Sequence, residues 1–172
     1  MSHIFGPIRQ LGYVVHDIED AMRRWSQTYG IGPFFYFEKA AMRDFRYIGE
    51  PYPIALSIAI VNSGDLQIEL IQQRNDVPSM YRDHLATHGE CLHHVSSWTT
   101  NYEADLKKIL AAGHEIGQEA RIGSSRLAYF KYNSAIPTVF EIYDVSGKAG
   151  VLNDQVREAA LSWDGSDPIR RL

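Results

Sequence analysis

The chain has 172 residues, 45% of them hydrophobic, and a formal net charge of -4, which suits one domain or two small modules sharing a core. Lys and Arg are scattered, which argues against a nucleic-acid partner, and no apolar run approaches the roughly 18 residues of a membrane-spanning helix. With no secretory leader pattern and a single cysteine, Cys91, we expect a cytoplasmic protein without an intrachain disulfide.

The first half of the chain predicts a β-α-β-β-β module, with elements at residues 8–15, 18–29, 34–37, 55–61 and 66–72. Asp17 is the expected N-cap of the helix, because its side chain can accept a hydrogen bond from the first turn, and Gly30 ends the helix. The last two strands flank residues 62–65, Asn-Ser-Gly-Asp, which are typical of a tight hairpin. Residues 49–53 carry a glycine and two prolines, so we expect an irregular substrate loop there.

A second module follows a polar connection that has a predicted helical turn at residues 81–85. Its elements are a strand at residues 92–98, a helix at 103–112, and a final hairpin of 126–132 and 138–143 around residues 133–137. We therefore predict an α+β fold of tandem β-α-β-β-β modules that form an open, cup-shaped mixed sheet. The single domain would span residues 1–172, with module one at about 6–75, module two at about 90–145, and a C-terminal extension at 146–172.

The C-terminal extension lies outside the repeat. Asp154 is expected to cap a short helix that runs to Trp163, and the segment around residues 156–163 is expected either to cover the cup or to cross to a neighbouring chain. Open cups built from short sheets leave edge strands and apolar surface that a partner can cover, so we expect a homodimer.

Two carboxylates lie at equivalent places in otherwise apolar strands: 72 residues separate Glu69 from Glu141, and 84 separate Gln10 from His94. A carboxylate is costly to bury alone, so this pair predicts a positive charge between them. We expect Gln10, Glu69, His94 and Glu141 to bind a divalent metal, for which one imidazole, one amide oxygen and two carboxylates suit Zn, Ni, Co or Mn. Taken alone, each has a simpler interpretation, since a mid-strand glutamate commonly faces solvent. His93 is expected to point away, because side chains alternate along a strand.

The residues that share a face with the predicted ligands suggest a substrate pocket. Gly12 and Ser96 are small where a packed core would normally hold Val or Leu, so they are expected to leave room for a ligand. Aromatic residues are dense between residues 34 and 52 and could either line a pocket or simply form core. The predicted substrate-binding residues are Gly12, Phe35, Tyr47, Ser96, Trp98 and Tyr143.

Four segments, at residues 10–22, 66–71, 92–95 and 138–142, resemble the metal-bearing segments of the vicinal oxygen chelate superfamily. That superfamily includes glyoxalase I, methylmalonyl-CoA epimerase, extradiol dioxygenases and bleomycin-resistance proteins. The resemblance covers roughly residues 6–145. It implies paired modules around a divalent metal that chelates vicinal oxygens of a substrate or intermediate.

The departures from the family pattern reduce the number of candidate reactions. The set Gln, Glu, His, Glu is similar to that of zinc-type glyoxalases I, but Val14 stands where those enzymes commonly have an arginine for glutathione. Extradiol dioxygenases bind iron through two histidines and one carboxylate, and Gln10 replaces the first histidine. The epimerase uses a further acid on a mid-module strand, where this sequence has Ser57 and neutral neighbours.

These features predict a metal-dependent lyase or isomerase that acts on a small, apolar or aromatic, oxo or vicinal-oxygen substrate. The metal would polarise a carbonyl and hold the resulting enediolate or enolate, and Glu141, or alternatively Glu69, would take the proton. The alternatives are a non-catalytic binding or resistance protein, a lactoylglutathione lyase of the glyoxalase I type, and a metal-free scaffold.

Overall fold

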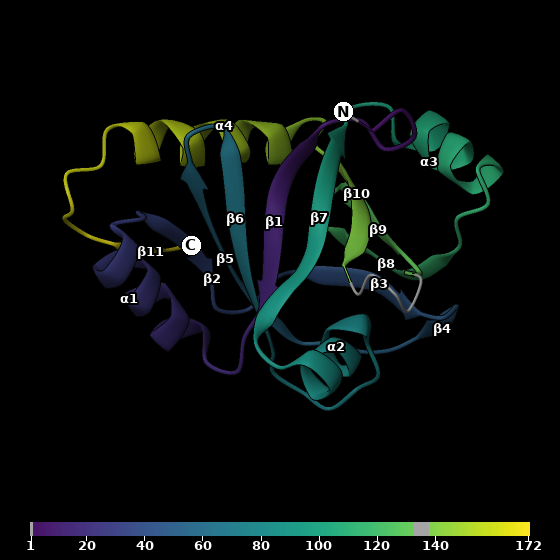
Figure 1. The fold of residues 1–172 in the computed structure, drawn as a ribbon, viewed down its shortest axis with the longest axis horizontal. Helices are drawn as coiled ribbons and strands as arrows, with labels where there is room; N and C mark the ends of the chain where they lie inside the picture. Colours follow the sequence, from purple (N-terminus) through teal and green to yellow (C-terminus); the bar gives the residue numbers. More distant parts are fainter. Residues whose placement is uncertain (1, 133–137) are drawn as a thin grey trace.

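The computed structural model describes residues 2–132 and 138–172, and within them it forms one 11-stranded mixed sheet with helices packed against it (Figure 1). None of the helices in these ranges is long and apolar enough to span a membrane. The elements are β1 Ile8–Val14, α1 Ile18–Tyr29, β2 Phe34–Phe37, β3 Met42–Tyr47, β4 Glu50–Pro51, β5 Leu56–Ser63, β6 Leu66–Gln73, α2 Met80–His88, β7 Cys91–Thr99, α3 Tyr102–Ala111, β8 Ile116–Ile122, β9 Ser125–Phe130, β10 Val139–Asp144, α4 Lys148–Leu161 and β11 Ile169–Arg171.

The sheet contains the same four-stranded arrangement twice. Its order is β11-β2-β5-β6-β1-β7-β10-β9-β8-β3-β4, so β2, β5, β6 and β1 correspond to β8, β9, β10 and β7. In each module the first strand runs parallel to the last, and the two modules join where β1 and β7 pair antiparallel. The α+β fold of tandem β-α-β-β-β modules predicted from the sequence is confirmed.

One helix from each module covers the outer face of its own half of the sheet (Figure 1). Asp17 caps α1 by accepting a hydrogen bond from the backbone N–H of Asp20 at 2.8 Å, and Gly30 ends α1 in the left-handed region at φ 64°. The buried face of α1 includes Ile18 and Met22 and packs against β5 and β6, while α3 packs in the same way against β9 and β10. The inner faces of both modules are left to form the cup.

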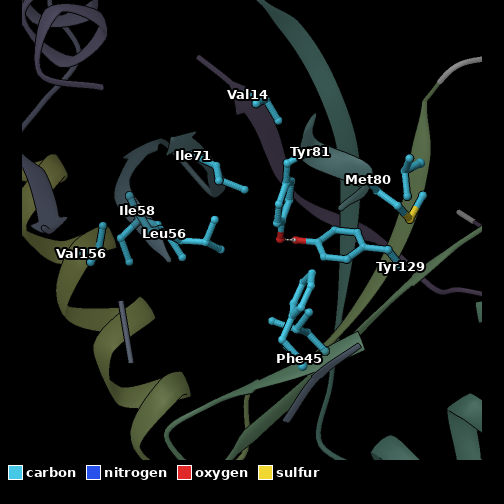
Figure 2. Close-up of a cluster of buried hydrophobic side chains, with 13 residues drawn as sticks. Val14, Phe45, Leu56, Ile58, Ile71, Met80, Tyr81, Tyr129 and Val156 are labelled. Carbon is cyan, nitrogen blue, oxygen red and sulfur yellow. Dashed lines mark hydrogen bonds between the residues drawn. The ribbon is translucent and has the colours of Figure 1, made fainter. Parts of the chain in front are cut away.

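The inner core links both modules to α2 and α4. Figure 2 shows Val156 of α4 beside Ile58 of β5, and the hydroxyl groups of Tyr81 and Tyr129 pointing toward each other. Tyr81 donates to Tyr129 at 3.0 Å, which satisfies one of these two buried hydroxyl groups. Because Val156 is fully buried, α4 closes one side of the cup within its own chain.

Two local predictions were wrong, and strands β8 and β11 were missed. Residues 42–47, which precede the Gly- and Pro-containing stretch, form β3, which pairs with β8 of the second module, and residues 50–51 form β4. Helix α4 begins at Lys148 after Gly147, so Asp154 lies inside the helix rather than at its cap. Strand β11 was not predicted, and the turn predicted at residues 133–137 lies outside the described residues. Strands β3 and β11 form by pairing with strands that are distant in the sequence, β8 and β2. Local sequence periodicity carries no information about such pairing.

The homodimer stays a prediction, which light scattering at micromolar concentration can test. Strands β11 and β4, at the sheet edges, are only 3 and 2 residues long, and α4 already covers part of the cup. The apolar surface and long open edges that motivated the dimer are therefore smaller than the sequence suggested. A mass near twice 19.6 kDa is the expected result, and a mass of one chain would contradict it.

Candidate metal centre

The predicted ligands come from four strands that lie side by side at the centre of the sheet: β6, β1, β7 and β10. Gly12 of β1 pairs with Glu69 on one side and with His94 on the other, and Gln10 lies two residues before Gly12. Glu141 of β10 is opposite the residue that follows His94 by two. Because paired residues and residues two apart share a face of a sheet, all four side chains project into the cup.

The imidazole of His94 is the centre of this group. Its Nε2 lies 3.3 Å from Oε2 of Glu69, 3.6 Å from Oε2 of Glu141 and 3.5 Å from Oε1 of Gln10. All four side chains are buried. Ligand atoms placed about 2.0–2.2 Å from a tetrahedral metal ion lie roughly 3.3–3.6 Å from one another. The three distances from Nε2 of His94 to these oxygen atoms fall within that range.

The residue types fit the divalent metal that the family resemblance implies. Carboxylate and amide oxygens together with one imidazole nitrogen form a borderline-hard donor set, and two carboxylates neutralise a divalent ion. Within residues 2–132 and 138–172, no three His, Cys, Asp or Glu side chains form a ready-made metal-binding group. The present arrangement is that of an imidazole held between two carboxylates, so a metal would require these side chains to turn toward a common point.

Burial and neighbouring charges shift the pKa values of this group. Burial raises the pKa of Glu141 to about 7; the charge of Glu69 adds to this effect and the charge of His94 opposes it. Burial lowers the pKa of His94, but attraction to Glu141 and a hydrogen bond to Glu69 outweigh burial, so the pKa is raised overall. A positive charge at His94 therefore partly compensates the acidic groups beside it when no metal is bound.

A β-bulge at His93 brings a second imidazole to the site. Gly12 pairs with His94 and Tyr13 pairs with Leu92, so His93 is an extra residue of β7 without a partner on β1. The expectation that His93 points away from His94 was wrong, because alternation fails at a bulge: the two Nδ1 atoms lie 3.1 Å apart. Burial holds the pKa of His93 well below its usual range. We therefore assign His93 as the neutral acceptor and Nδ1 of His94 as the donor, which leaves Nε2 of His94 for the carboxylates or a metal.

Gly12 makes room for His94 rather than for a substrate. A Cβ atom built on Gly12 would overlap the imidazole ring of His94. The small residue at this position therefore lets a ligand side chain of the next strand lie against the β1 backbone, a role that the sequence did not predict.

A cavity of about 300 Å³ is lined by three of the four predicted ligands, Gln10, Glu69 and Glu141, whereas His94 does not line it. Of the predicted substrate-binding residues, Tyr143 lines it, whereas Gly12, Phe35, Tyr47, Ser96 and Trp98 do not. Phe35 lies under the guanidinium group of Arg170, and the hydroxyl of Tyr47 donates to Asp83. The lining residues are Gln10, Phe37, Ala40, Ala41, Met42, Ile58, Ile60, Gln67, Glu69, Tyr81, Ile122, Gly123, Ser124, Ser125, Leu127, Tyr129, Glu141, Tyr143, Lys148, Ala149, Leu152 and Asn153.

Three lining residues with polar groups near the ligands were missed from the sequence. Tyr129 is paired with Glu141 across β9 and β10, and Gln67 is paired with Gln10 across β6 and β1. Gln67 was identifiable in principle, because it lies two residues before Glu69 on the same face. Asn153 comes from α4, and no local pattern connects it with the sheet.

Comparison with known proteins identifies the family. Residues 9–130 match the model described as the Glyoxalase/Bleomycin resistance protein/Dioxygenase superfamily. The chain belongs to this family, the vicinal oxygen chelate superfamily. The resemblance recognised in four sequence segments is therefore confirmed. No curated protein sequence matches the chain.

Solved structures of methylmalonyl-CoA epimerases have the same vicinal oxygen chelate fold. The Mycobacterium tuberculosis epimerase is 15% identical with a TM-score of 0.62, over 88% of this chain and 95% of that chain. A variant of the Streptomyces coelicolor epimerase, in complex with 2-nitronate-propionyl-CoA, is 20% identical with a TM-score of 0.60, over 83% of this chain and 96% of that chain. At these identities the likeness shows the fold alone. Glu141 and α4 lie beyond the residues that match the family model.

Gly12→Ala should destabilise this vicinal oxygen chelate protein by about 1–3 kcal/mol, because the added methyl group displaces the His94 ring. Urea denaturation measures the loss, and zinc affinity should fall with it. Gly117→Ala is the matched control: its Cβ would meet Sδ of Met80 at 2.8 Å, the flexible end of a side chain, so a loss below about 1 kcal/mol is expected. Equal losses in both variants would contradict the proposed contact.

Glu141→Gln should raise the melting temperature of metal-free protein above about pH 7 by roughly 3–8 °C. The folded state keeps a proton on Glu141 up to about pH 7, whereas the ordinary carboxyl pKa is 4.5. The contribution of Glu141 to the free energy of unfolding therefore falls as pH rises from 4.5 to about 7, and it stays low above about pH 7.

Thermal denaturation at about pH 5 and about pH 8, with EDTA or with zinc, tests this pH dependence. With zinc at about pH 8, wild type should have a higher melting temperature than Glu141→Gln, because a carboxylate binds the ion more strongly than an amide. Glu158→Gln, at an exposed position of α4, is the matched control. A lower melting temperature for metal-free Glu141→Gln than for wild type at about pH 8 would contradict the prediction.

Proposed function

We propose that the protein is a metal-dependent lyase or isomerase that removes a proton next to a carbonyl group of a small, apolar or aromatic oxo substrate. The observation that carries this proposal is the group of three oxygen atoms around Nε2 of His94, because the side chains that supply them, Gln10, Glu69 and Glu141, line a largely apolar cavity. Buried acid and base groups next to a cavity are the usual signature of a catalytic site.

His94, Glu69, Glu141 and Gln10 would hold the metal, which as Zn, Ni, Co or Mn supplies Lewis-acid stabilisation of a developing oxyanion. Glu141 is the proposed general base, and to act as one it would have to leave the metal. Its raised pKa makes its ionised form a stronger base than an ordinary carboxylate. Glu69 is the second acidic residue of the lining and the alternative base.

The cavity wall supports the proposed substrate class. Phe37, Ile58 and Leu127 are among its apolar residues, and Lys148 is the cationic residue among those that line it. Val14, at the position where glyoxalases I commonly have an arginine, is 1% exposed and packs in the inner core. A substrate with several carboxylates, such as a glutathione conjugate, would find little charge compensation here. An apolar wall also excludes water, which strengthens electrostatic interactions at the site.

A non-catalytic binding or resistance protein is the second candidate. The apolar lining favours it, because such a wall binds flat apolar molecules without any chemistry. The two candidates differ in what happens to the proton next to the carbonyl group, which an exchange experiment can follow.

The test is elemental analysis of purified protein, followed by solvent deuterium exchange with a panel of 2-oxo, thioester and vicinal-oxygen compounds. We expect metal-dependent exchange with at least one small apolar oxo compound, and a loss of about 10²–10⁴-fold in Glu141→Gln. Glu158→Gln should exchange at the wild-type rate. Tight binding without exchange for every compound would favour the binding protein, and exchange that survives metal removal would contradict metal dependence.

A further inference from the structure

A network of buried amide groups lies beside the candidate metal centre and includes Gln10. Gln67 is 1% exposed, and its Oε1 accepts a hydrogen bond from Nε2 of Gln10 at 2.7 Å. Its Nε2 donates to Oδ1 of Asn153 at 3.3 Å and lies 3.5 Å from Oδ1 of Asn62. The four amides come from β1, β5, β6 and α4, so the network joins the C-terminal helix to the first predicted ligand.

A backbone carbonyl fixes the direction of the Asn62 amide and, through it, the directions of the Gln67 and Gln10 amides. A side-chain amide turned by half a circle keeps its shape but exchanges its donor and acceptor, so hydrogen-bond partners decide its orientation. Nδ2 of Asn62 donates to the carbonyl oxygen of Gly64 at 3.1 Å, and a carbonyl can only accept. Asn62 must therefore turn its oxygen toward Gln67, and Gln67 in turn must offer its oxygen to Gln10.

The direction of Gln67 also decides which atom of Gln10 faces the candidate metal centre. Because Gln10 donates with Nε2 to Gln67, its Oε1 is the atom that faces Nε2 of His94, at 3.5 Å. An amide oxygen binds cations, whereas the NH₂ group of a reversed amide would repel them.

We propose that Gln67 is the positioning residue of this centre, which keeps the amide oxygen of Gln10 turned toward the metal-binding position. The proposal rests on the proposed function in one respect, the binding of a divalent metal. Asn153 holds Gln67 from the other side, so α4 supports the orientation of Gln10 although it supplies no predicted ligand. Partners behind a metal ligand commonly contribute about 10- to 100-fold to metal affinity.

The experiment measures binding of Zn²⁺ alone and Co²⁺ alone to the full chain. Gln67→Met preserves the shape of the side chain but removes its hydrogen bonds, so we expect affinity to fall by about 10-fold and the Co²⁺ absorption spectrum to change. In a Gln10→Glu background, the two carboxylate oxygens at position 10 are equivalent, so the orientation of this side chain no longer matters. Adding Gln67→Met to this background should therefore lower metal affinity by less than about 3-fold. Gln155→Met, exposed on α4, is the matched control and should bind both ions like wild type.

Each outcome decides the proposal. Equal losses in the two backgrounds would show that Gln67 acts only through general packing and would overturn it, as would unchanged affinity in Gln67→Met. If the wild-type protein binds neither ion, both the metal dependence and the positioning role are overturned. If the wild-type protein binds the ions and Gln67→Met binds them with the same affinity, the positioning role alone is overturned. If Gln67→Met does not fold, Gln67→Glu, which still accepts from Gln10, must bind Co²⁺ at least as tightly as wild type, and weaker binding would refute the proposal.

Discussion

The burial of two carboxylates beside one imidazole is the constraint on which the rest of this structure depends. Glu69 and Glu141 are 8% and 3% exposed, and both approach Nε2 of the fully buried His94. Charges in such a place are tolerated only when a compensating charge and hydrogen bonds accompany them. The neutral state of His93, the absence of a side chain at Gly12 and the direction of the Gln10 amide all serve this requirement.

The duplicated architecture explains why such a group can form at all. Each module places its first and last strands in parallel at the centre of the sheet, so the two modules together bring β6, β1, β7 and β10 side by side. One polar residue from each of these strands then faces the same cup. The module is stable because α1 and α3 cover the outer faces with apolar side chains, which leaves the inner face available for polar chemistry.

The C-terminal helix turns the open cup into a site with a distinct environment. Val156 packs into the inner core, Leu152 lines the cavity and Asn153 bonds to Gln67. These contacts come from a segment beyond the residues that match the family model. The helix thus contributes both an apolar wall and a polar support to the site.

The sequence by itself determined the features that local chemistry encodes. Asp17 and Gly30 marked the ends of α1, residues 62–65 marked a hairpin, and the internal repeat placed Glu69 opposite Glu141 in the fold, because caps, turns and periodicity depend on neighbours in the chain. Only the tertiary structure decided the bulge at His93, the pairing of β3 with β8, and the amide network behind Gln10. Each of these depends on which distant strand or helix becomes a neighbour, and backbone register between distant segments leaves no mark in either segment alone.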